Sequence, residues 1–328
     1  MSPLLEVEDV SKHYDRGRSG AFGFGPRTLL RAVDGVSLRI DAGTTLGLVG
    51  ESGCGKSTLG RLLIRLLPPT GGRITFDGEE ISALHGPALK RPRRNMGIVF
   101  QDPYGALDPR MTVGAIVREP LLIHGEPADK ARIGAMLDRV GLPPSAATRY
   151  PHEFSGGQRQ RIGIARALIM QPRFLVCDEP VSALDVSVQA GIVNLLQDLQ
   201  AELGVAMLFI AHDLSVVRHI SDRVAVMYLG RVVEQGDKRS LYGEPLHPYT
   251  QALIAAVPAL SPAGRAERRA RRTRVTGDIP SAMAIPLGCR FHTRCPHVMA
   301  ICRTDDPVLT PQTPGHDVAC HLYPRSAA

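Results

Sequence analysis

Short runs of apolar residues recur along the first three quarters of the chain, separated by longer stretches with helical periodicity. The apolar runs predict strands at 4–10, 36–40, 45–49, 96–100, 174–177, 206–211 and 224–228. The periodic stretches predict helices, of which the clearest are 56–67, 131–140, 159–170 and 186–203. Strands that alternate with helices predict an α/β fold, with a parallel sheet covered on both faces.

Two parts of the chain depart from this alternation. Residues 102–171 contain no convincing strand, so they are predicted to form a helical insertion within the sheet. After residue 243 the periodicity gives way to prolines, arginines and clustered cysteines, which predicts two domains, 1–243 and 244–328. Residues 16–27 are rich in Gly and Arg and are expected to form a mobile loop.

Composition and charge narrow the class of protein. The chain of 328 residues carries a net charge of +7, and much of the excess positive charge lies in one run, Arg265 to Arg274. This run is expected to be a solvated linker; contact with lipid phosphates or with a partner chain is the alternative. No uncharged apolar run reaches the roughly 18 residues that a membrane helix requires. Glu6, Glu8 and Asp9 stand where a signal peptide carries positive charge, so we expect a cytosolic chain.

A phosphate-binding loop is indicated by the sequence GESGCGKST, which follows a predicted strand and opens a predicted helix. Glycines in such a loop let successive backbone N–H groups and the helix N-terminus point at an anion. Lys56 is expected to reach the β- and γ-phosphates, and Ser57 to bind Mg²⁺. The predicted nucleotide contacts are Gly50, Ser52, Gly53, Cys54, Gly55, Lys56, Ser57 and Thr58. A glycine-rich turn with an incidental lysine is the alternative.

Two carboxylates follow the apolar run 174–177. Asp178 and Glu179 are therefore expected at the carboxyl edge of the sheet, where parallel α/β folds bind nucleotides. In that position Asp178 completes the Mg²⁺ shell and Glu179 polarises the attacking water. Taken alone, such a pair is equally consistent with a solvated loop or a helix start, so its interpretation depends on the motifs around it.

Further motifs stand in order around this acidic strand. Ser155-Gly156-Gly157-Gln158 precedes it, and Ser182-Ala183-Leu184-Asp185 and then His212 follow. With the phosphate-binding loop, these motifs resemble the ABC transporter ATPase family over residues 4–243. The resemblance implies a P-loop NTPase with a RecA-like parallel core, an antiparallel β subdomain, a helical subdomain at about 102–171 and a small C-terminal assembly or regulatory domain.

The resemblance also implies roles for individual residues. Glu179, His212 and Gln101 match the family's catalytic positions, and Ser57, Gln101 and Asp178 match the positions that bind Mg²⁺. Tyr14 matches the aromatic residue that stacks on adenine, although Tyr14 and His212 taken singly would be ordinary loop or core residues. The positions that contact a nucleotide bound by the opposing subunit are matched by Ser155, Gly156, Gly157, Gln158 and Asp185. Phe154 departs from the family, where many members carry Leu, and Cys177 fills an apolar strand position.

Three segments are similar to the oligopeptide and dipeptide importer branch of the family: FQDPYGALDP at 100–109, HPYT at 247–250 and GDIPS at 277–281. Residues 50–61 are closest to the F-type subunit. The branch implies a peripheral protein on the cytoplasmic face of the membrane, with a D-type ATPase partner, two transmembrane permease subunits, an extracytoplasmic substrate-binding protein and no nucleic acid. Import of nickel or glutathione, and a soluble ABC ATPase acting on ribosomes or DNA, are the alternatives.

Four cysteines gather near the carboxyl end, with the spacing Cys-x5-Cys-x6-Cys-x17-Cys at Cys289, Cys295, Cys302 and Cys320. In a cytosolic chain such a group predicts a metal rather than disulfides. Close Cys-x2-Cys pairs are missing, which favours a [4Fe–4S] cluster over Zn²⁺, and the resemblance points the same way. Zinc and free or partly oxidised thiols remain open, and His292, His297 and His316 are expected to be packed or solvated rather than ligands.

Overall fold

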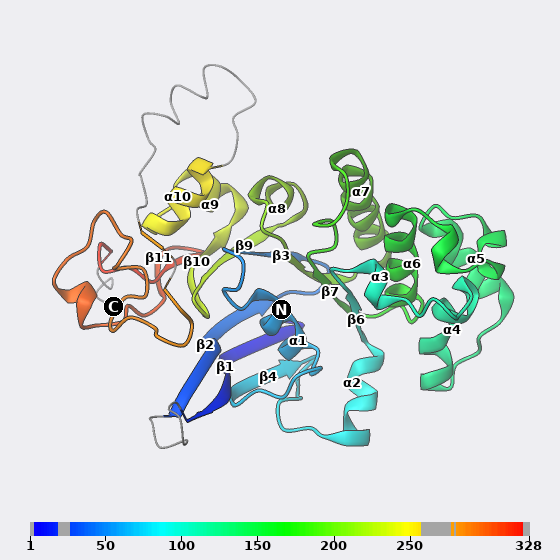
Figure 1. Ribbon diagram of the computed structural model, residues 1–328, viewed down its shortest axis with the longest axis horizontal. Coiled ribbons are helices and arrows are strands. Elements are labelled where there is room, and N and C mark those ends of the chain that lie inside the picture. The colour runs from blue at the N-terminus through cyan, green and yellow to red at the C-terminus, as the bar shows by residue number, and fades with distance from the viewer. Residues whose placement is uncertain (1–2, 19–26, 257–276, 279, 324–328) are drawn as a thin grey trace, which may run out of the picture.

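Two β-sheets organise the computed structural model, which describes residues 3–18, 27–256, 277–278 and 280–323 (Figure 1). The strands are β1 (Leu5–Arg18), β2 (Arg27–Ile40), β3 (Thr45–Val49), β4 (Gly71–Phe76), β5 (Glu79–Glu80), β6 (Met96–Val99), β7 (Phe174–Asp178), β8 (Ala206–Ile210), β9 (Arg223–Tyr228), β10 (Arg231–Asp237), β11 (Thr310–Thr313) and β12 (His316–Val318). The helices are α1 (Lys56–Leu63), α2 (Lys90–Arg94), α3 (Pro103–Ala106), α4 (Val113–His124), α5 (Lys130–Arg139), α6 (Gly156–Leu168), α7 (Val186–Leu203), α8 (Leu214–Ile220), α9 (Lys238–Gly243) and α10 (Pro248–Ala256).

The larger sheet has eight strands in the order β11-β12-β10-β9-β3-β8-β7-β6. Strands β6, β7, β8, β3 and β9 run parallel, as the sequence predicts, whereas β10, β12 and β11 are antiparallel. Alternate side chains enter two cores, with Leu46 and Leu48 on one face and Met207 and Phe209 on the other. The sheet is therefore buried on both sides, which explains the uninterrupted apolar runs.

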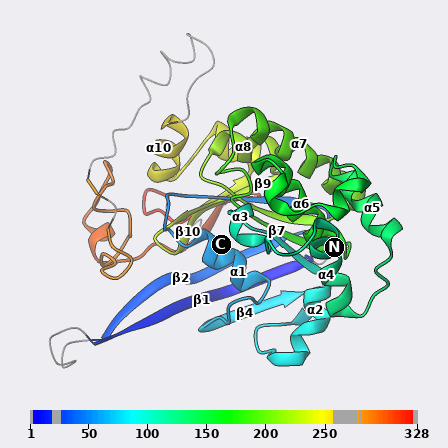
Figure 2. The same cartoon turned by 45° about the vertical axis from the view of Figure 1, so that its right-hand side comes forward.

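Different elements cover the two faces of this sheet. Helix α1 and the four-stranded antiparallel sheet β2-β1-β4-β5 share one core, and α6, α7 and α8 contribute to the other (Figure 2). The insertion at 102–171 contains α3 to α6 and two short 3-10 helices, and its described residues include no strand. The predicted antiparallel subdomain and helical insertion are thus both present.

The sequence-based boundaries were wrong for β1, β2 and α1. The ladder between β1 and β2 extends from the pair Leu5 and Ile40 to the pair Arg18 and Arg27, because each strand supplies the other's backbone partners and this overrides the loop-like Gly and Arg content. Of the predicted loop at 16–27, residues 19–26 lie outside the described part of the chain. Helix α1 ends at Leu63 rather than 67, since Arg65 takes a φ of 57° and its buried guanidinium donates to the carbonyls of Ile81 and Leu84.

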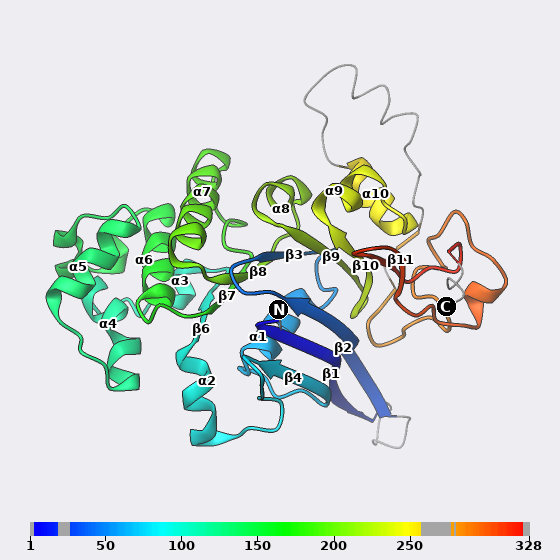
Figure 3. The same ribbon diagram turned by 180° about the vertical axis from the view of Figure 1, so that it is seen from behind.

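The carboxyl end returns to the main sheet. Strand β12 pairs with β10, with Glu234 opposite Val318, and β11 pairs with β12 at the sheet edge (Figure 3). The segment between α10 and this edge includes the arginine run Arg265 to Arg274, which lies outside the described residues, as does Ile279 of the predicted GDIPS motif. The domain boundary near residue 243 stays a prediction.

Gly47 on β3 permits close packing of α8 on the sheet, and this contact gives a stability prediction. A Cβ atom at Gly47 would lie 2.3 Å from Cγ1 of Val217 and 2.4 Å from Oγ of Ser221. We expect Gly47→Ala to lower the free energy of unfolding by about 1–3 kcal/mol through overpacking, measured as a fall in Tm. Gly163→Ala on α6 is the control, because its Cβ meets no atom within 4 Å and Ala favours helix. Equal Tm values for the two variants would contradict this account.

Candidate functional site

The loop between β3 and α1 is shaped by backbone packing against two neighbouring strands. A Cβ at Gly50 would lie 2.2 Å from the carbonyl oxygen of Met227, and one at Gly55 would lie 2.1 Å from that of Ala32. Gly55 also takes a φ of 109°, which other residues rarely adopt. These two positions therefore admit only glycine, and the loop's tight course at the end of β3 depends on them.

Lys56 is the first residue of α1, and its ammonium turns back over the loop. The residue is 4% exposed. Its Nζ donates to the carbonyl oxygens of Gly50 at 2.8 Å and Glu51 at 3.1 Å, and lies 3.9 Å from Oε1 of Glu179. An ammonium has three donors, so this arrangement holds the loop and leaves a donor for an incoming phosphate oxygen.

Ser57 and Asp178 bring a hydroxyl and a carboxylate together. Ser57 Oγ donates to Oδ1 of Asp178 at 2.7 Å, and Asp178 is 1% exposed at the end of β7. Burial raises the pKa of Asp178, although the Ser57 hydrogen bond and the Arg61 guanidinium, 3.8 Å away, oppose the shift. Oxygen donors of these two kinds suit Mg²⁺, and a dication bound there would favour the ionised carboxylate.

Glu179 lies at the centre of a polar cluster formed by the ends of several strands. Its φ of 46° is unusual for a residue other than glycine, and its N–H donates to Ile210 of β8 at 3.0 Å. Oε2 accepts from Nε2 of Gln101 at 3.2 Å and lies 3.5 Å from Nδ1 of His212. Backbone strain of this kind is often retained at functional sites. The structure thus brings together Lys56, Gln101, Glu179 and His212, beside a cavity of 50 Å³ partly lined by Glu179 and His212.

The Ser-Gly-Gly-Gln motif forms the amino end of α6. Ser155 Oγ accepts from the N–H of Gln158 at 3.4 Å, and the Gln158 side chain accepts from the N–H of Ser155 at 3.0 Å. This capping box starts the helix at Gly156, three residues before the predicted start at Arg159. Ser155 and Gln158 are exposed, and α6 lies on the opposite face of the sheet from α1 (Figure 1). Among the described residues, no hydrogen bond or ion pair joins residues 155–158 to the loop 50–58.

The remaining residues predicted to contact nucleotide lie at other places within residues 4–243. Tyr14 lies on β1 with Nζ of Lys12 5.2 Å from its ring centroid, and Asp185 is exposed at the start of α7. Cys54 is buried, and burial raises the pKa of its thiol, so only its backbone can serve an anion. Ser52 is exposed and Thr58 half-buried at the loop and first turn of α1.

Sequence reasoning missed a group of tail residues that contact the loop. The N–H of Glu51 donates to the hydroxyl of Tyr249 at 2.9 Å. The Glu51 carboxylate accepts two hydrogen bonds from Arg294, at 2.8 and 3.0 Å. Position 51 is unspecified in the phosphate-loop pattern, and Arg294 stands 243 residues away, so no local signal in the sequence linked them.

All six cysteines are free thiols, and the four tail cysteines lie in one region. Burial raises the pKa of Cys289 to about 12 and of Cys320 to about 11, and nearby tail thiols push both values in the same direction. Four thiols are chemically suited to iron or zinc. Within the described ranges, however, no group of three or more His, Cys, Asp or Glu residues has a geometry that could hold a metal ion.

The tail histidines have other partners. His316 Nε2 lies 2.8 Å from Oε1 of the buried Glu234, and His292 Nδ1 lies 2.9 Å from the carbonyl oxygen of Cys289. The N–H of His297 donates to Sγ of Cys295 at 3.4 Å. The [4Fe–4S] cluster therefore stays a prediction, and no step of nucleotide chemistry depends on it.

Comparison with known proteins places the chain in a family. Residues 33–182 match the ABC transporter model, and residues 233–302 match the oligopeptide/dipeptide transporter C-terminal region. The oligopeptide transport ATP-binding protein AppF of Bacillus subtilis is 52% identical over 98% of this chain and 97% of its own length. The putative oligopeptide transport ATP-binding protein YkfD of the same organism is 51% identical, over 98% of this chain and 96% of its own.

The fold agrees with that of solved cassettes. A dimeric structure of the ATP-binding cassette MJ0796, in a post-hydrolysis state bound to ADP and Pi, superposes with a TM-score of 0.64 at 30% identity, covering 72% of this chain and 99% of that one. In the part of the chain that the structure describes, every helix is too short or too polar to cross a membrane. Because AppF and YkfD are more than half identical to it along nearly its whole length, the chain belongs to the ABC transporter family of ATP-binding proteins.

Proposed function

We propose that this chain is the ATP-hydrolysing subunit of a membrane importer for di- and oligopeptides. The observation that carries the proposal is the convergence of Lys56, the Ser57 and Asp178 pair, and Glu179 with its two polar neighbours at one edge of the parallel sheet. The peptide cargo is supported by the names of AppF and YkfD and by the match of residues 233–302 to the oligopeptide/dipeptide transporter C-terminal region. Nickel and glutathione are the alternative cargoes.

The cluster suits hydrolysis of a phosphoanhydride. Lys56 and the loop N–H groups bind the phosphates. Ser57, Asp178 and Gln101 would hold Mg²⁺, which when bound would supply positive charge beside the phosphate oxygens. Glu179 accepts a proton from the attacking water, and Gln101 and His212 orient its carboxylate through the contacts at 3.2 and 3.5 Å. As ADP and phosphate form, His212 is placed to contact the released phosphate.

We further propose that two such cassettes close head to tail over ATP. The N–H groups of Gly156 and Gly157 at the start of α6 have no hydrogen-bond partner among the described residues, and Ser155 is exposed. The dimeric form of MJ0796 supports this arrangement. ATP then bridges the phosphate loop of one chain and the Ser-Gly-Gly-Gln corner of another, and hydrolysis releases them. The second chain is a related D-type ATPase, and Tyr14 stacks on adenine while Asp185 faces the opposing subunit.

The pair acts at the cytoplasmic face of the membrane. It drives two transmembrane permease subunits, which receive cargo from an extracytoplasmic substrate-binding protein. A soluble ABC ATPase acting on ribosomes or DNA is the rival, and the oligopeptide/dipeptide transporter match at 233–302 favours the importer.

Substitution of Glu179 tests the assigned base. We expect Glu179→Gln in the assembled transporter to lower the rate of ATP hydrolysis by at least about a hundredfold while MgATP binding persists, because the amide cannot take a proton. Lys56→Ala is the contrasting control, since it removes a phosphate contact and should weaken MgATP binding itself. Turnover by Glu179→Gln at the wild-type rate would overturn the role of Glu179.

Purification from detergent-solubilised membranes tests the assembly. An affinity-tagged chain is expected to bring down two permease subunits and a second ATPase of similar size, identified by mass spectrometry. Ribosomal proteins or DNA in place of permeases would favour the rival function. The tagged Lys56→Ala chain serves as a matched control, because assembly with the permeases does not require nucleotide in this account.

The tail cysteines give a separate test of the metal proposal. We propose that Cys289, Cys295, Cys302 and Cys320 bind a [4Fe–4S] cluster, with Zn²⁺ as the alternative; their gathering in one region and the free state of their thiols support this. The chain purified without oxygen is expected to carry about four iron and four sulfide per chain and to absorb visible light, and Cys302→Ser to lose both. Zinc without sulfide would favour the alternative. A purified chain that carries neither iron nor zinc would refute the proposal.

A further inference from the structure

The short segment from Cys289 to Cys295 sends two arginine side chains toward the nucleotide site. Arg294 is the better placed of the two. Its Nη1 and Nη2 each donate to one oxygen of Glu51, at 2.8 and 3.0 Å, and Nη1 lies 3.4 Å from the hydroxyl of Tyr228. The side chains of Arg294 and Glu51 are only 11% and 24% exposed. A two-pronged pair of this kind fixes both the distance and the orientation of the carboxylate.

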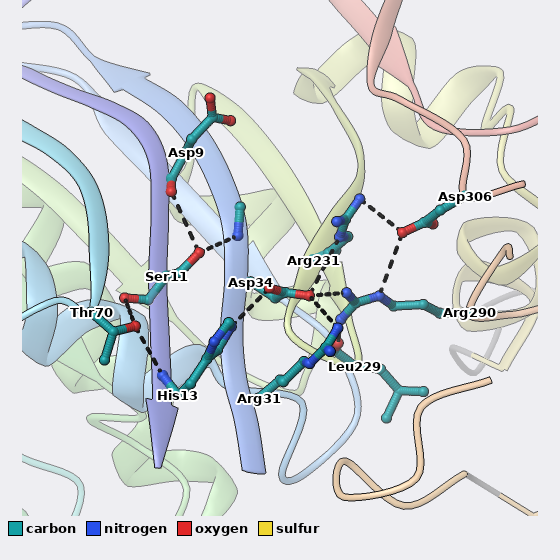
Figure 4. A network of polar contacts seen from close by, with 11 residues as sticks. Asp9, Ser11, His13, Arg31, Asp34, Thr70, Leu229, Arg231, Arg290 and Asp306 are labelled. Carbon is teal, nitrogen blue, oxygen red and sulfur yellow. Dashed lines mark hydrogen bonds and ion pairs between the residues drawn. The ribbon is translucent and has the colours of Figure 1, made fainter. Parts of the chain in front are cut away.

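Arg290 reaches the other side of the site. Its guanidinium pairs with Asp34 of β2 and donates to the carbonyl of Leu229 (Figure 4). Asp34 also lies 2.8 Å from Nε2 of His13, the residue before Tyr14 on β1. Burial raises the pKa of Asp34, but hydrogen bonding and charge from Arg290 outweigh burial and leave that pKa below its usual value. The contact is therefore an ion pair rather than a neutral hydrogen bond.

Aromatic packing makes the segment rigid. Phe291 packs edge-on against Tyr228 at a centroid distance of 5.3 Å and lies 5.5 Å from the ring of Tyr249. Tyr249, on α10, accepts from the N–H of Glu51, while Arg294 holds the same residue's carboxylate. The N–H and the carboxylate of Glu51 are thus both held by residues that lie outside the phosphate-loop motif.

The charge of Glu51 makes this fixation matter for nucleotide binding. Glu51 is the second residue of the loop that binds phosphates, and its carbonyl oxygen also accepts from Lys56. An unpaired carboxylate at that position would repel a polyphosphate, and its electrostatic interactions could change the conformation of the loop. The guanidinium of Arg294 neutralises the carboxylate and holds it on the tail side of the loop.

We propose that Arg294 is a positioning residue for nucleotide binding, through which the cysteine-bearing tail sets the affinity of the phosphate loop. Arg294 does not touch the nucleotide in this proposal; it acts through Glu51. Because Arg290 and Arg294 lie between Cys289 and Cys295, a displacement of this segment reaches the phosphate loop through Glu51 and reaches His13 of β1 through Asp34 of β2. The proposal rests on the nucleotide site described above.

A double-mutant cycle on the full-length chain tests the proposal, with MgADP as the probe so that hydrolysis does not intervene. We expect Arg294→Met to raise the Kd for MgADP about tenfold in calorimetric titration, and Arg294→Lys to raise it less, because a single ammonium neutralises the charge without the two-pronged geometry. In the Glu51→Gln background, Arg294→Met is expected to change the Kd by less than about twofold, since its partner charge is gone.

Arg303→Met is the matched control. Arg303 is an exposed arginine of the same tail and forms no ion pair with the described residues, so its removal should leave the Kd unchanged. Thermal unfolding without nucleotide identifies any variant that has lost its fold. A tenfold effect of Arg294→Met in both backgrounds, or none in either, would overturn the proposal. If the wild-type chain bound no MgADP, the nucleotide site itself would be refuted instead.

Discussion

A buried ammonium holds the phosphate loop in place. Lys56 is nearly inaccessible to water, so its ammonium needs partners within the protein, and it donates to the carbonyl oxygens of Gly50 and Glu51 at 2.8 and 3.1 Å. Those contacts require the loop to fold back on the start of α1. The fold-back in turn requires glycine at positions 50 and 55, where neighbouring backbone leaves no space for a side chain. The Lys56 contacts and the two glycines thus hold the loop in one shape, and a preorganised loop lowers the ordering cost of phosphate binding.

The sequence predicted those features that local chemistry determines. The Gly-rich loop and the acidic end of β7 each follow from a few adjacent residues, so their patterns were visible without a structure. The extension of β1 to Arg18 was not visible, because the strength of that strand comes from its partner β2 rather than from its own glycine and arginine content. Likewise, the end of α1 depends on carbonyls that Arg65 finds in residues 81 and 84, well outside the helix.

The contacts of the tail were the hardest to predict, and for the same reason. Nothing near Glu234 signals that its carboxylate accepts the N–H groups of Leu246 and His247 and contacts His316, or that β10 gains β12 as a neighbour. These contacts place the tail against the edge of the catalytic sheet. Burial lowers the pKa of His247 to about 4, so that histidine stays neutral at physiological pH and packs as an aromatic residue beside Phe291. The described part of the tail thus shares a core with the ATP-binding part of the chain.

The positions of the phosphate loop and of the Ser-Gly-Gly-Gln motif support the proposal that two chains together form the working ATPase. Helices α1 and α6 pack on opposite faces of one sheet, and among the described residues no hydrogen bond or ion pair joins their two starts. At α6 the capping box satisfies the N–H groups of Ser155 and Gln158, whereas those of the half-buried Gly156 and Gly157 have no hydrogen-bond partner among the described residues. A helix start with free N–H groups and no acidic residue in its first turn is complementary to an anion held by another molecule. In the proposed dimer, closure of two chains over ATP would satisfy these groups, and hydrolysis would remove the bridging charge that favours closure.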